Sequence, residues 1–237
     1  MKKTMISAAL AVVLMVPFAG QALASSPFTD ISSSTAKQQI ESLQAQGVIS
    51  GVNASEFRPT ESLTTAQGIT LIVRSMNLSL AAIDFNTAPT ASGWFKNVSD
   101  DAWYANDFIN AKANGLDLAE DIDPKEPMTR EQFVHLLVQG LEKTGNYPLI
   151  KMYINITDEA AITTEYQGTI QRALLYKLTE LDKDGNFDPQ AIVTRADAAV
   201  LVYNAVKFVE THQEPVVEQP SEEQPVDDGG SAVVELE

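Results

Sequence analysis

The chain has 237 residues, with 16 Lys and Arg against 32 Asp and Glu, a formal net charge of −16, and no cysteine. This acidic excess argues against nucleic-acid binding, because neutralising phosphates requires a basic surface, and against docking on an anionic membrane. Without cysteine the chain cannot carry a lipoprotein anchor, a disulfide or a thiolate–metal site.

The N-terminal residues carry the pattern of a secretory signal. Lys2 and Lys3 precede an apolar run over 5–18, and Ala22-Leu23-Ala24 has the form of a cleavage site, so we predict a signal peptide over residues 1–24. Its removal takes away two lysines and no acid, which changes the charge from −16 to −18. No later segment approaches the ~20 apolar residues of a membrane span, so no membrane insertion is expected after cleavage. A secreted chain without cysteine favours a Gram-positive exterior.

A five-residue frame recurs at a spacing of 65 residues, as LTTAQ at 63–67, MTREQ at 128–132 and VTRAD at 193–197. Fixed spacing of this kind indicates internal repeats. The first Thr of each frame is where a helix N-cap is expected, and the Gln three residues later in the first two frames completes a capping box. Asp197 is a shorter substitute in the third frame.

Each frame lies inside a longer block with the same order of features. A block opens with an aromatic-x-polar-aliphatic motif and continues through a first helix, a cap position, a loop with proline, the frame and a second helix. The openings are FTDI at 28–31, FKNV at 95–98 and YINI at 153–156, the cap positions are Gly47, Gly115 and Lys177, and the loops contain Phe57-Arg58-Pro59, Ile122-Asp123-Pro124 and Phe187-Asp188-Pro189.

Apolar residues at helical spacing predict the buried face of each helix. In the first helices these are Ile40 and Leu43, then Phe108, Ile109 and Ala113, then Ile170, Leu174 and Leu175. In the second helices they are Ile69, Ile72, Val73 and Met76, then Phe133, Leu136, Leu137 and Leu141, then Val200, Leu201, Ala205 and Val206.

One helix–loop–helix block cannot bury its own apolar face, whereas three packed together can. We therefore predict an all-α fold of three repeats. The predicted organisation is a signal peptide (1–24), repeat 1 (25–78), a linker (79–93), repeat 2 (94–146), repeat 3 (147–210) and an acidic, disordered tail (211–237).

Capping accounts for the threonines of the frames but not for Arg130 and Arg195. Both arginines occupy the first helical position, where the helix dipole disfavours a cation. An arginine beside free backbone N–H groups would make an anion site that holds a carboxylate or phosphate in two bonds. An internal ion pair with one of the many acids is the alternative, and the pattern leaves both open.

Together the blocks resemble the S-layer homology (SLH) module of bacterial envelope proteins. The resemblance is carried by Phe28-Thr29-Asp30-Ile31, by Trp103-Tyr104 at a helix start, by Gly47 and Gly115, by the Phe-x-Pro loops and by the Thr-Arg-acid frame. It covers about residues 28–210. Each motif is weak alone, and three ordered copies make a strong signal.

The resemblance implies a pseudo-threefold unit, with a central three-helix bundle and further helices as prongs. It also implies that grooves between prongs bind secondary cell-wall polysaccharide that often carries pyruvate ketals. The frame arginine would meet the ketal carboxylate and the aromatic would support the sugar. The expected ligand-binding residues are Arg130, Arg195, Trp103, Asp30, Thr129 and Thr194.

Several positions depart from the family pattern. Thr65 replaces the frame arginine in block one, and Thr35 aligns with Trp103. Block three has Glu165 at the tryptophan position with Tyr166 beside it, and blocks two and three have Asn97 and Asn155 where the opening aspartate would be. We therefore expect one good site, or two, and a first block kept for packing.

Three other features predict structure rather than chemistry. DKDGNFDP at 182–189 resembles a calcium loop, but its Gly is at the fourth place and no Glu follows at the twelfth, so a polar turn is the better interpretation. His135 is expected at a helix surface or core edge, and Trp94 as a core plug. Two histidines and no cysteine leave little for metal ligation, and no metal or cofactor is expected.

The resulting expectation is a secreted, non-enzymatic module that attaches non-covalently to an anionic cell-wall polysaccharide at the cell surface. Other envelope or S-layer proteins are possible further partners. Because the protein's own charge repels an anionic polymer at long range, binding should weaken at low ionic strength. The alternatives are a degenerate module that assembles envelope proteins without binding glycan, and a small secreted glycan hydrolase.

Overall fold

The computed structural model describes residues 28–147 and 152–212, and these residues form helices and loops without a named β-strand. This confirms the predicted all-α class. The predicted signal peptide and the tail beyond His212 lie outside the described residues. The helices are α1 (Lys37–Ala45), α2 (Thr65–Ser75), α3 (Ala91–Trp94), α4 (Ala105–Ala113), α5 (Arg130–Leu141), α6 (Gln167–Leu175) and α7 (Arg195–His212), with short 3-10 turns at Glu159–Ala161 and Thr164–Tyr166.

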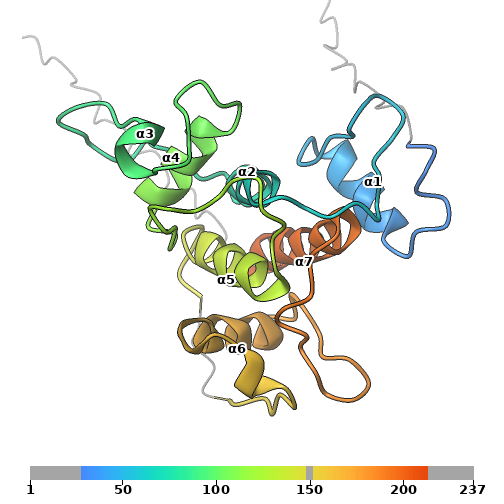
Figure 1. Cartoon of the computed structure of the whole chain (residues 1–237). Helices are drawn as coiled ribbons and strands as arrows, with labels where there is room; N and C mark the ends of the chain where they lie inside the picture. Colours follow the sequence, from blue (N-terminus) through green and yellow to red (C-terminus); the bar gives the residue numbers. More distant parts are fainter. Residues whose placement is uncertain (1–27, 148–151, 213–237) are drawn as a thin grey trace, which may run out of the picture.

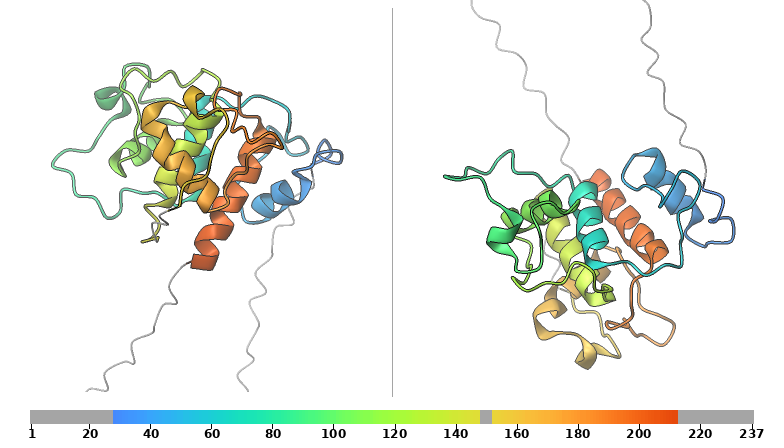
Figure 2. Two further views of the ribbon diagram at one scale, coloured as in Figure 1. Left: turned by 90° about the horizontal axis from the view of Figure 1, so that it is seen from below. Right: turned by 45° about the horizontal axis from the view of Figure 1, so that its top comes forward.

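The second helices of the three blocks, α2, α5 and α7, form the centre of the molecule, and each contacts the other two (Figure 1). The first helices pack around them, each against the central helix of the preceding block. Helix α4 packs on α2, α6 packs on α5, and α1 closes the cycle on α7. Figure 2 shows α2 and α7 side by side between α4 and α1. The contacts follow a cyclic order, and the threefold symmetry itself stays a prediction.

A ring of backbone hydrogen bonds links the three frames. The N–H of Leu63 donates to the carbonyl of Val193 (2.8 Å), Val193 donates to Met128 (3.0 Å), and Met128 donates to Leu63 (3.0 Å). These residues are the aliphatic first positions of the frames, and all three are buried. Their constant spacing therefore has a physical cause, because each must reach the same ring.

The backbone N–H groups beside the frame arginines are not free, contrary to the sequence-based hypothesis of an anion site at the helix tips. In every frame the first two helical N–H groups donate to carbonyls of the proline loop of the next block. The pairs are Thr65 to Glu126, Ala66 to Pro124, Arg130 to Ala191, Glu131 to Pro189, Arg195 to Glu61 and Ala196 to Pro59, at 2.8–3.0 Å. The helix N-termini thus connect the repeats, and these N–H groups are not available to bind an anion.

The predicted capping interactions are present in all three frames. The hydroxyls of Thr64 and Thr129 accept from the backbone N–H groups of Gln67 and Gln132, whose side chains reach back to complete capping boxes. In the third frame, the Asp197 carboxylate accepts from the Thr194 N–H at 3.0 Å. The sequence therefore located all three starts of the central helices.

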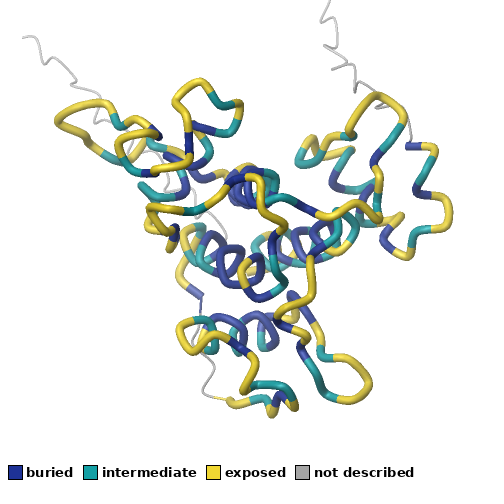
Figure 3. The backbone as a smooth tube through the Cα atoms, in the orientation of Figure 1, coloured by how far each residue is buried: buried dark blue, intermediate teal, exposed yellow. Residues whose placement is uncertain are grey.

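The predicted apolar faces form one core, and exposure rises toward the peripheral loops (Figure 3). Among the residues predicted to be buried, four are only half-buried: Ala113, Leu175, Val200 and Val206. Trp94 is also half-buried and packs on the core as expected.

The ends of the first helices share one cap geometry. Gly47 and Gly115 adopt positive φ (71° and 81°), and so does Lys177 (57°). At each site the next residue donates its N–H to the carbonyl five residues back, as Val48 does to Leu43, which is the Schellman pattern. A left-handed conformation costs lysine more than glycine, so the third cap is the strained one.

The opening motif of repeat 3 lies three residues later in the chain than the sequence pattern predicts. Asp158, rather than Asn155, corresponds to Asp30, because its carboxylate accepts from the N–H groups of Phe187 and Asp188 at 2.8 Å. Asp30 accepts in the same way from the two residues that begin its own proline loop. The shift arose because the aromatic Tyr153 was matched to Phe28, whereas Ile156 is the buried counterpart.

Helix α7 projects beyond its neighbours (Figure 2, left) and runs to His212, two residues into the predicted tail. The stretch 79–93, predicted as a linker, consists mostly of exposed loop and includes the start of α3. None of the helices in the described ranges has the length and hydropathy of a bilayer-crossing span.

Candidate functional site

Three corresponding pockets lie beside the three frames. Each is lined by the frame residue of one repeat, the loop that follows the first helix of the next repeat in the cycle, and one face of a central helix. Pocket 1 contains Arg195, pocket 2 contains Arg130, and pocket 3 contains Thr65. The side chains that complete each pocket decide what it can bind.

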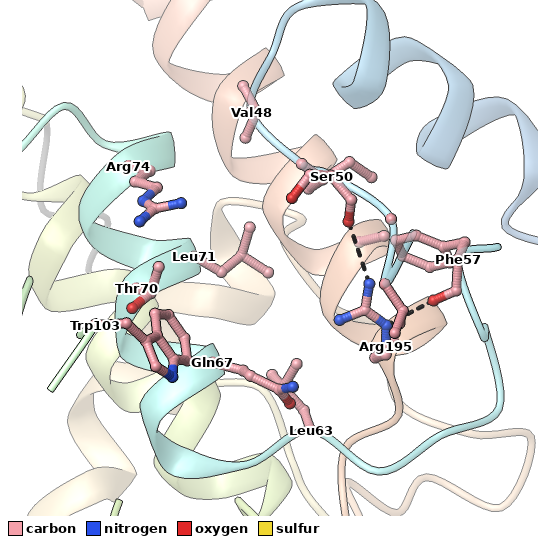
Figure 4. Close-up of a pocket in the computed structure, with 14 residues that line it drawn as sticks. Val48, Ser50, Phe57, Leu63, Gln67, Thr70, Leu71, Arg74, Trp103 and Arg195 are labelled. Atoms are coloured by element: carbon pink, nitrogen blue, oxygen red, sulfur yellow. Dashed lines mark hydrogen bonds between the residues drawn. The ribbon is translucent and has the colours of Figure 1, made fainter. Parts of the chain in front are cut away.

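Pocket 1, of about 260 Å³, brings together two of the predicted binding residues (Figure 4). Arg195 comes from the start of α7 and Trp103 from the turn before α4, so residues 92 positions apart in different repeats line one cavity. The Trp103 side chain is 62% exposed. An exposed indole and a guanidinium that line one cavity offer both a stacking surface for a sugar ring and a donor for an acid group.

Arg195 is held firmly but keeps donors for a ligand. Its Nε donates to the carbonyl of Phe57 at 2.7 Å and its Nη2 to that of Ser50 at 3.2 Å. Its third nitrogen, Nη1, has no hydrogen-bond partner within the described residues, and the guanidinium faces the pocket in Figure 4. Burial lowers the pKa of Arg195 while Glu61 and Asp30 oppose that change, and arginine remains charged at neutral pH.

Arg74 and Thr70 also line pocket 1, and sequence reasoning missed both. The Thr70 hydroxyl is buried without a hydrogen-bond partner in the described structure. Arg74 adds a second guanidinium to the cavity. The signal for Arg74 was in the sequence, because Gln139 and Asn204 follow it at the same 65-residue spacing, so an arginine stands where the other repeats carry an amide.

Pocket 2 holds the second predicted arginine but lacks an aromatic lining residue. Arg130 donates from Nη2 to the Thr179 hydroxyl at 2.9 Å and to the Glu180 carbonyl at 3.1 Å. Its Nε is buried without a partner in the described part of the chain. The first helix α1 contributes Gln39 to this pocket. Pocket 2 therefore offers no aromatic surface on which a sugar could stack.

Pocket 3 has no arginine, and its frame threonine is bonded internally, whereas His135 Nε2 is buried without a hydrogen-bond partner in the described residues. The Thr65 hydroxyl donates to the Glu126 carbonyl at 3.1 Å. His135 is buried, not at the surface, and its ring stacks on Tyr166 at 4.2 Å with Nδ1 2.8 Å from the Thr169 hydroxyl. Burial lowers the pKa of His135. This arrangement is that of a core-edge histidine, as one of the predicted interpretations had it.

The charges of the three pockets differ strongly. Pocket 1 is lined by two arginines and no acid. Pocket 2 combines Arg130 with Glu180 and Asp197. Pocket 3 has three acids, Asp117, Asp123 and Glu126, and neither Lys nor Arg. Of these three pockets, pocket 1 is therefore the one whose lining side chains carry a net positive charge, in a protein that is acidic overall.

The internal ion pairs proposed as an alternative role for the frame arginines are not found. Within the described residues, Arg130 and Arg195 take part in none of the salt bridges, which involve Lys37, Arg58, Arg74, Arg172, Lys183 and Lys207. Both instead bond to carbonyl or hydroxyl oxygens. Neutral acceptors orient a guanidinium without cancelling its charge.

The remaining predicted residues, Asp30, Thr129 and Thr194, bond to the backbone of the loops and helices that form the pockets. Asp30 accepts from the N–H groups of Phe57 (2.9 Å) and Arg58 (2.7 Å) and fixes the loop beneath Arg195. Burial alone would raise the pKa of Asp30, but these donors and the charge of Arg195 hold it below the usual value. Thr129 and Thr194 serve as helix caps. That any of these three touches a ligand stays a prediction.

Two further polar sites have structural explanations. The DKDGNFDP segment is a turn in which the Asp182 carboxylate accepts from the N–H groups of Asp184 and Asn186 at 2.8–2.9 Å. The described residues contain no group of three His, Asp or Glu placed to hold a metal ion. Glu131, which the sequence did not single out, is buried and accepts from Thr163 and Gln190, so it ties two loops of repeat 3 to α5.

Several curated relatives are similar to most of this chain. An endoglucanase of Bacillus sp. (strain KSM-635) is 29% identical over 202 residues, which is 83% of this chain and 21% of that protein. The surface-layer 125 kDa protein of Lysinibacillus sphaericus is 27% identical over 210 residues, covering 86% and 17%. Exoglucanase XynX of Acetivibrio thermocellus is 23% identical over 183 residues, covering 76% and 16%. The chain spans about a fifth or less of these relatives.

The family model of the S-layer homology domain matches two stretches of the chain, residues 27–67 and 155–199. These stretches hold the frames of repeats 1 and 3, together with their opening motifs as the structure aligns them. The intervening block, which the family model does not match, has the same cap, proline loop and frame geometry. Residues 27–67 and 155–199 are therefore similar to the S-layer homology domain.

Proposed function

We propose that this protein attaches non-covalently to the bacterial cell wall by binding an anionic, pyruvylated secondary cell-wall polysaccharide in pocket 1. The match of two stretches to the S-layer homology domain, and the similarity to a surface-layer protein, associate the chain with cell-wall components at the cell surface. The finer proposal concerns which polymer is bound and where. Secretion through the predicted signal peptide and a Gram-positive host stay predictions.

One observation carries the proposal: Arg195 and Trp103 line the same cavity, and no acid lines it with them. A ketal carboxylate can accept from the Arg195 guanidinium, since charge-assisted pairs are the stronger hydrogen bonds. The sugar that carries the ketal can then lie against the exposed Trp103 indole. Because the overall charge of the protein repels the polymer, contacts of this short range must provide the affinity.

The relatives support an attachment role rather than a shared reaction. Their printed names include glucanases and a surface-layer protein, yet the chain matches about a fifth or less of each. A module common to proteins with different names fits a shared location on the cell better than a shared substrate. We therefore propose that this chain has no catalytic activity of its own.

A sedimentation assay with purified cell-wall sacculi tests the proposal. Wild-type protein should sediment with untreated sacculi and stay in solution once the non-peptidoglycan polymer has been removed. Trp103→Ala should lose most of the retention, and because the indole is exposed this change should leave the fold intact. Arg195→Gln should lose retention as well, whereas Arg130→Gln, at the same frame position in pocket 2, should retain nearly wild-type binding.

The same assay separates the alternatives. If retention is unchanged after the polymer is removed, and also in Trp103→Ala and Arg195→Gln, the assay would support the assembly role without glycan binding. Soluble sugar released from the sacculi would point to a hydrolase. Equal losses in Arg130→Gln and Arg195→Gln would show that pocket 1 is not the principal site.

A further inference from the structure

Pocket 1 has a second guanidinium that the frames do not supply. Arg74 lies near the C-terminal end of α2, whereas Arg195 lies at the start of α7, and Figure 4 shows them on opposite sides of the cavity. In this view Leu71 lies between the two arginines, and Trp103 lies on the same side of the cavity as Arg74. A ligand that contacts both arginines must therefore span the cavity, with the indole of Trp103 lining the Arg74 side.

The other repeats show what this helix position usually does. The Gln139 side chain accepts from the backbone N–H of Asp117 at 2.9 Å, and the Asn204 side chain donates to the carbonyl of Leu178 at 3.0 Å. In both repeats an amide fastens the loop that follows a first helix. Arg74 makes no such bond to its own corresponding loop over 48–52 in the described structure, so the position has lost its fastening role in repeat 1.

Arg74 instead contacts α4 and keeps further donors. Its Nη2 donates to the Asp107 carboxylate at 3.3 Å, and this is the only hydrogen bond that the Arg74 side chain makes within the described residues. The Arg74 side chain is 56% exposed, while that of Asp107 is 13% exposed. A guanidinium has five N–H donors, so a single contact from behind orients Arg74 and leaves the others for a ligand.

We propose that pocket 1 recognises two acidic groups on one glycan segment, the first at Arg195 and the second at Arg74. The inference rests on the proposed function and extends it to a second charge on the ligand. The second group is a carboxylate or a phosphate, since a guanidinium binds either through paired N–H donors. The sugar that carries the second group contacts Trp103, which lines the same side of the cavity as Arg74.

A purely structural role for Arg74, as a link between α2 and α4, makes a different prediction. In that case the loss of the Arg74–Asp107 pair would weaken binding whichever partner is changed. Arg74→Gln installs the residue that the fold uses at the same position in repeat 2. Asp107→Asn breaks the same pair but leaves the guanidinium in place, and is therefore the matched control.

Titration calorimetry on the full chain with three defined sugars tests the proposal. The probes are an N-acetylhexosamine with one pyruvate ketal, the same sugar with an added anomeric phosphate, and a disaccharide with a ketal on each unit. Wild-type protein should bind at least one of the two doubly acidic probes about tenfold more tightly than the first. Arg74→Gln should abolish that gain without changing affinity for the first probe, and Asp107→Asn should keep it.

The outcomes distinguish this inference from the function on which it rests. If wild-type protein binds all three probes equally, or if Asp107→Asn loses the gain as Arg74→Gln does, the second recognition point is overturned and attachment through Arg195 stands. If Arg195→Gln binds every probe as wild-type does, the proposed function fails as well. A gain with the phosphate probe alone, or with the disaccharide alone, identifies the second group.

Discussion

The guanidinium of Arg195 lies 4.6 Å above the ring centroid of Phe57 and donates to the carbonyl of that same residue at 2.7 Å. Arg130 lies over Phe187 in the corresponding way, at 5.1 Å. Both phenylalanines are buried plugs that precede the proline of their loops. One residue thus fills the core and orients the arginine, so the scaffold and the candidate site are physically coupled.

Replacing Phe57 by Leu should keep the apolar plug and remove the ring beneath the arginine. We expect a loss of stability of about 1 kcal/mol from reduced packing, and a severalfold loss of sacculus retention because a cation–π contact worth about 0.5–2 kcal/mol no longer holds Arg195. Urea unfolding and the sedimentation assay measure the two effects. Phe187→Leu should cost similar stability but little retention, and equal retention losses would contradict the coupling described for pocket 1.

Much of the scaffold could be predicted because backbone requirements recur at fixed spacing. The ring through Leu63, Met128 and Val193 and the caps at Thr64 and Thr129 demand the same residue types in each repeat, and the 65-residue period follows from them. The error at Asn155 arose where a loop shifts by three residues and an aromatic at 153 imitates the motif. Local patterns cannot detect such a shift, because the decisive contacts are made 29–30 residues away, between Asp158 and Phe187-Asp188.

The candidate site could be predicted only in part. The pairing of Arg195 with Trp103 depends on which first helix packs on which central helix, and the cyclic order of contacts is a tertiary property. Arg74 could have been noticed as a charged residue among amides at the same spacing, but nothing local says that it faces a pocket. The bonds of the frame N–H groups to the neighbouring loops also depend on how the repeats pack, so the sequence alone predicts free N–H groups.

The Asp30 carboxylate should make stability depend on pH in the acid range. Its folded-state pKa lies below the ordinary value of 3.8, so its contribution is complete above that value and is lost as pH falls through the lower folded-state pKa. Asp30→Asn should cost about 1 kcal/mol at neutral pH and make the acid decline shallower. Urea unfolding from pH 2 to pH 7 (~1-unit steps) measures this, with the exposed Asp84→Asn as control. An unchanged acid slope in Asp30→Asn would contradict the assignment.

His135 should produce a separate pH dependence at higher pH. Burial lowers its folded-state pKa below 6.5, helped by Arg172 and opposed by Asp117 and Glu131. As pH falls below 6.5, His135 binds a proton in the unfolded chain but stays neutral in the folded chain. The free energy of unfolding therefore declines with decreasing pH and does not change above about pH 7. His135→Phe keeps a ring on Tyr166, and Thr169 keeps its bond to the Tyr166 carbonyl. We expect this variant to lose the slope between about pH 5 and 7, and a persisting slope would assign it to other groups.

Lys177 marks a place where the chain can be stabilised by a single change. It holds the left-handed cap position that Gly47 and Gly115 occupy in the other repeats, with φ of 57°. Lys177→Gly should remove the steric cost of that conformation and raise the free energy of unfolding by about 1 kcal/mol. The reverse change, Gly47→Lys, should cost a similar amount for backbone reasons alone, because a Cβ at Gly47 would meet no atom within 4 Å. Urea denaturation with an unchanged m value checks both. If Lys177→Gly fails to stabilise while Gly47→Lys destabilises, the lysine side chain must make a compensating contact in the folded protein.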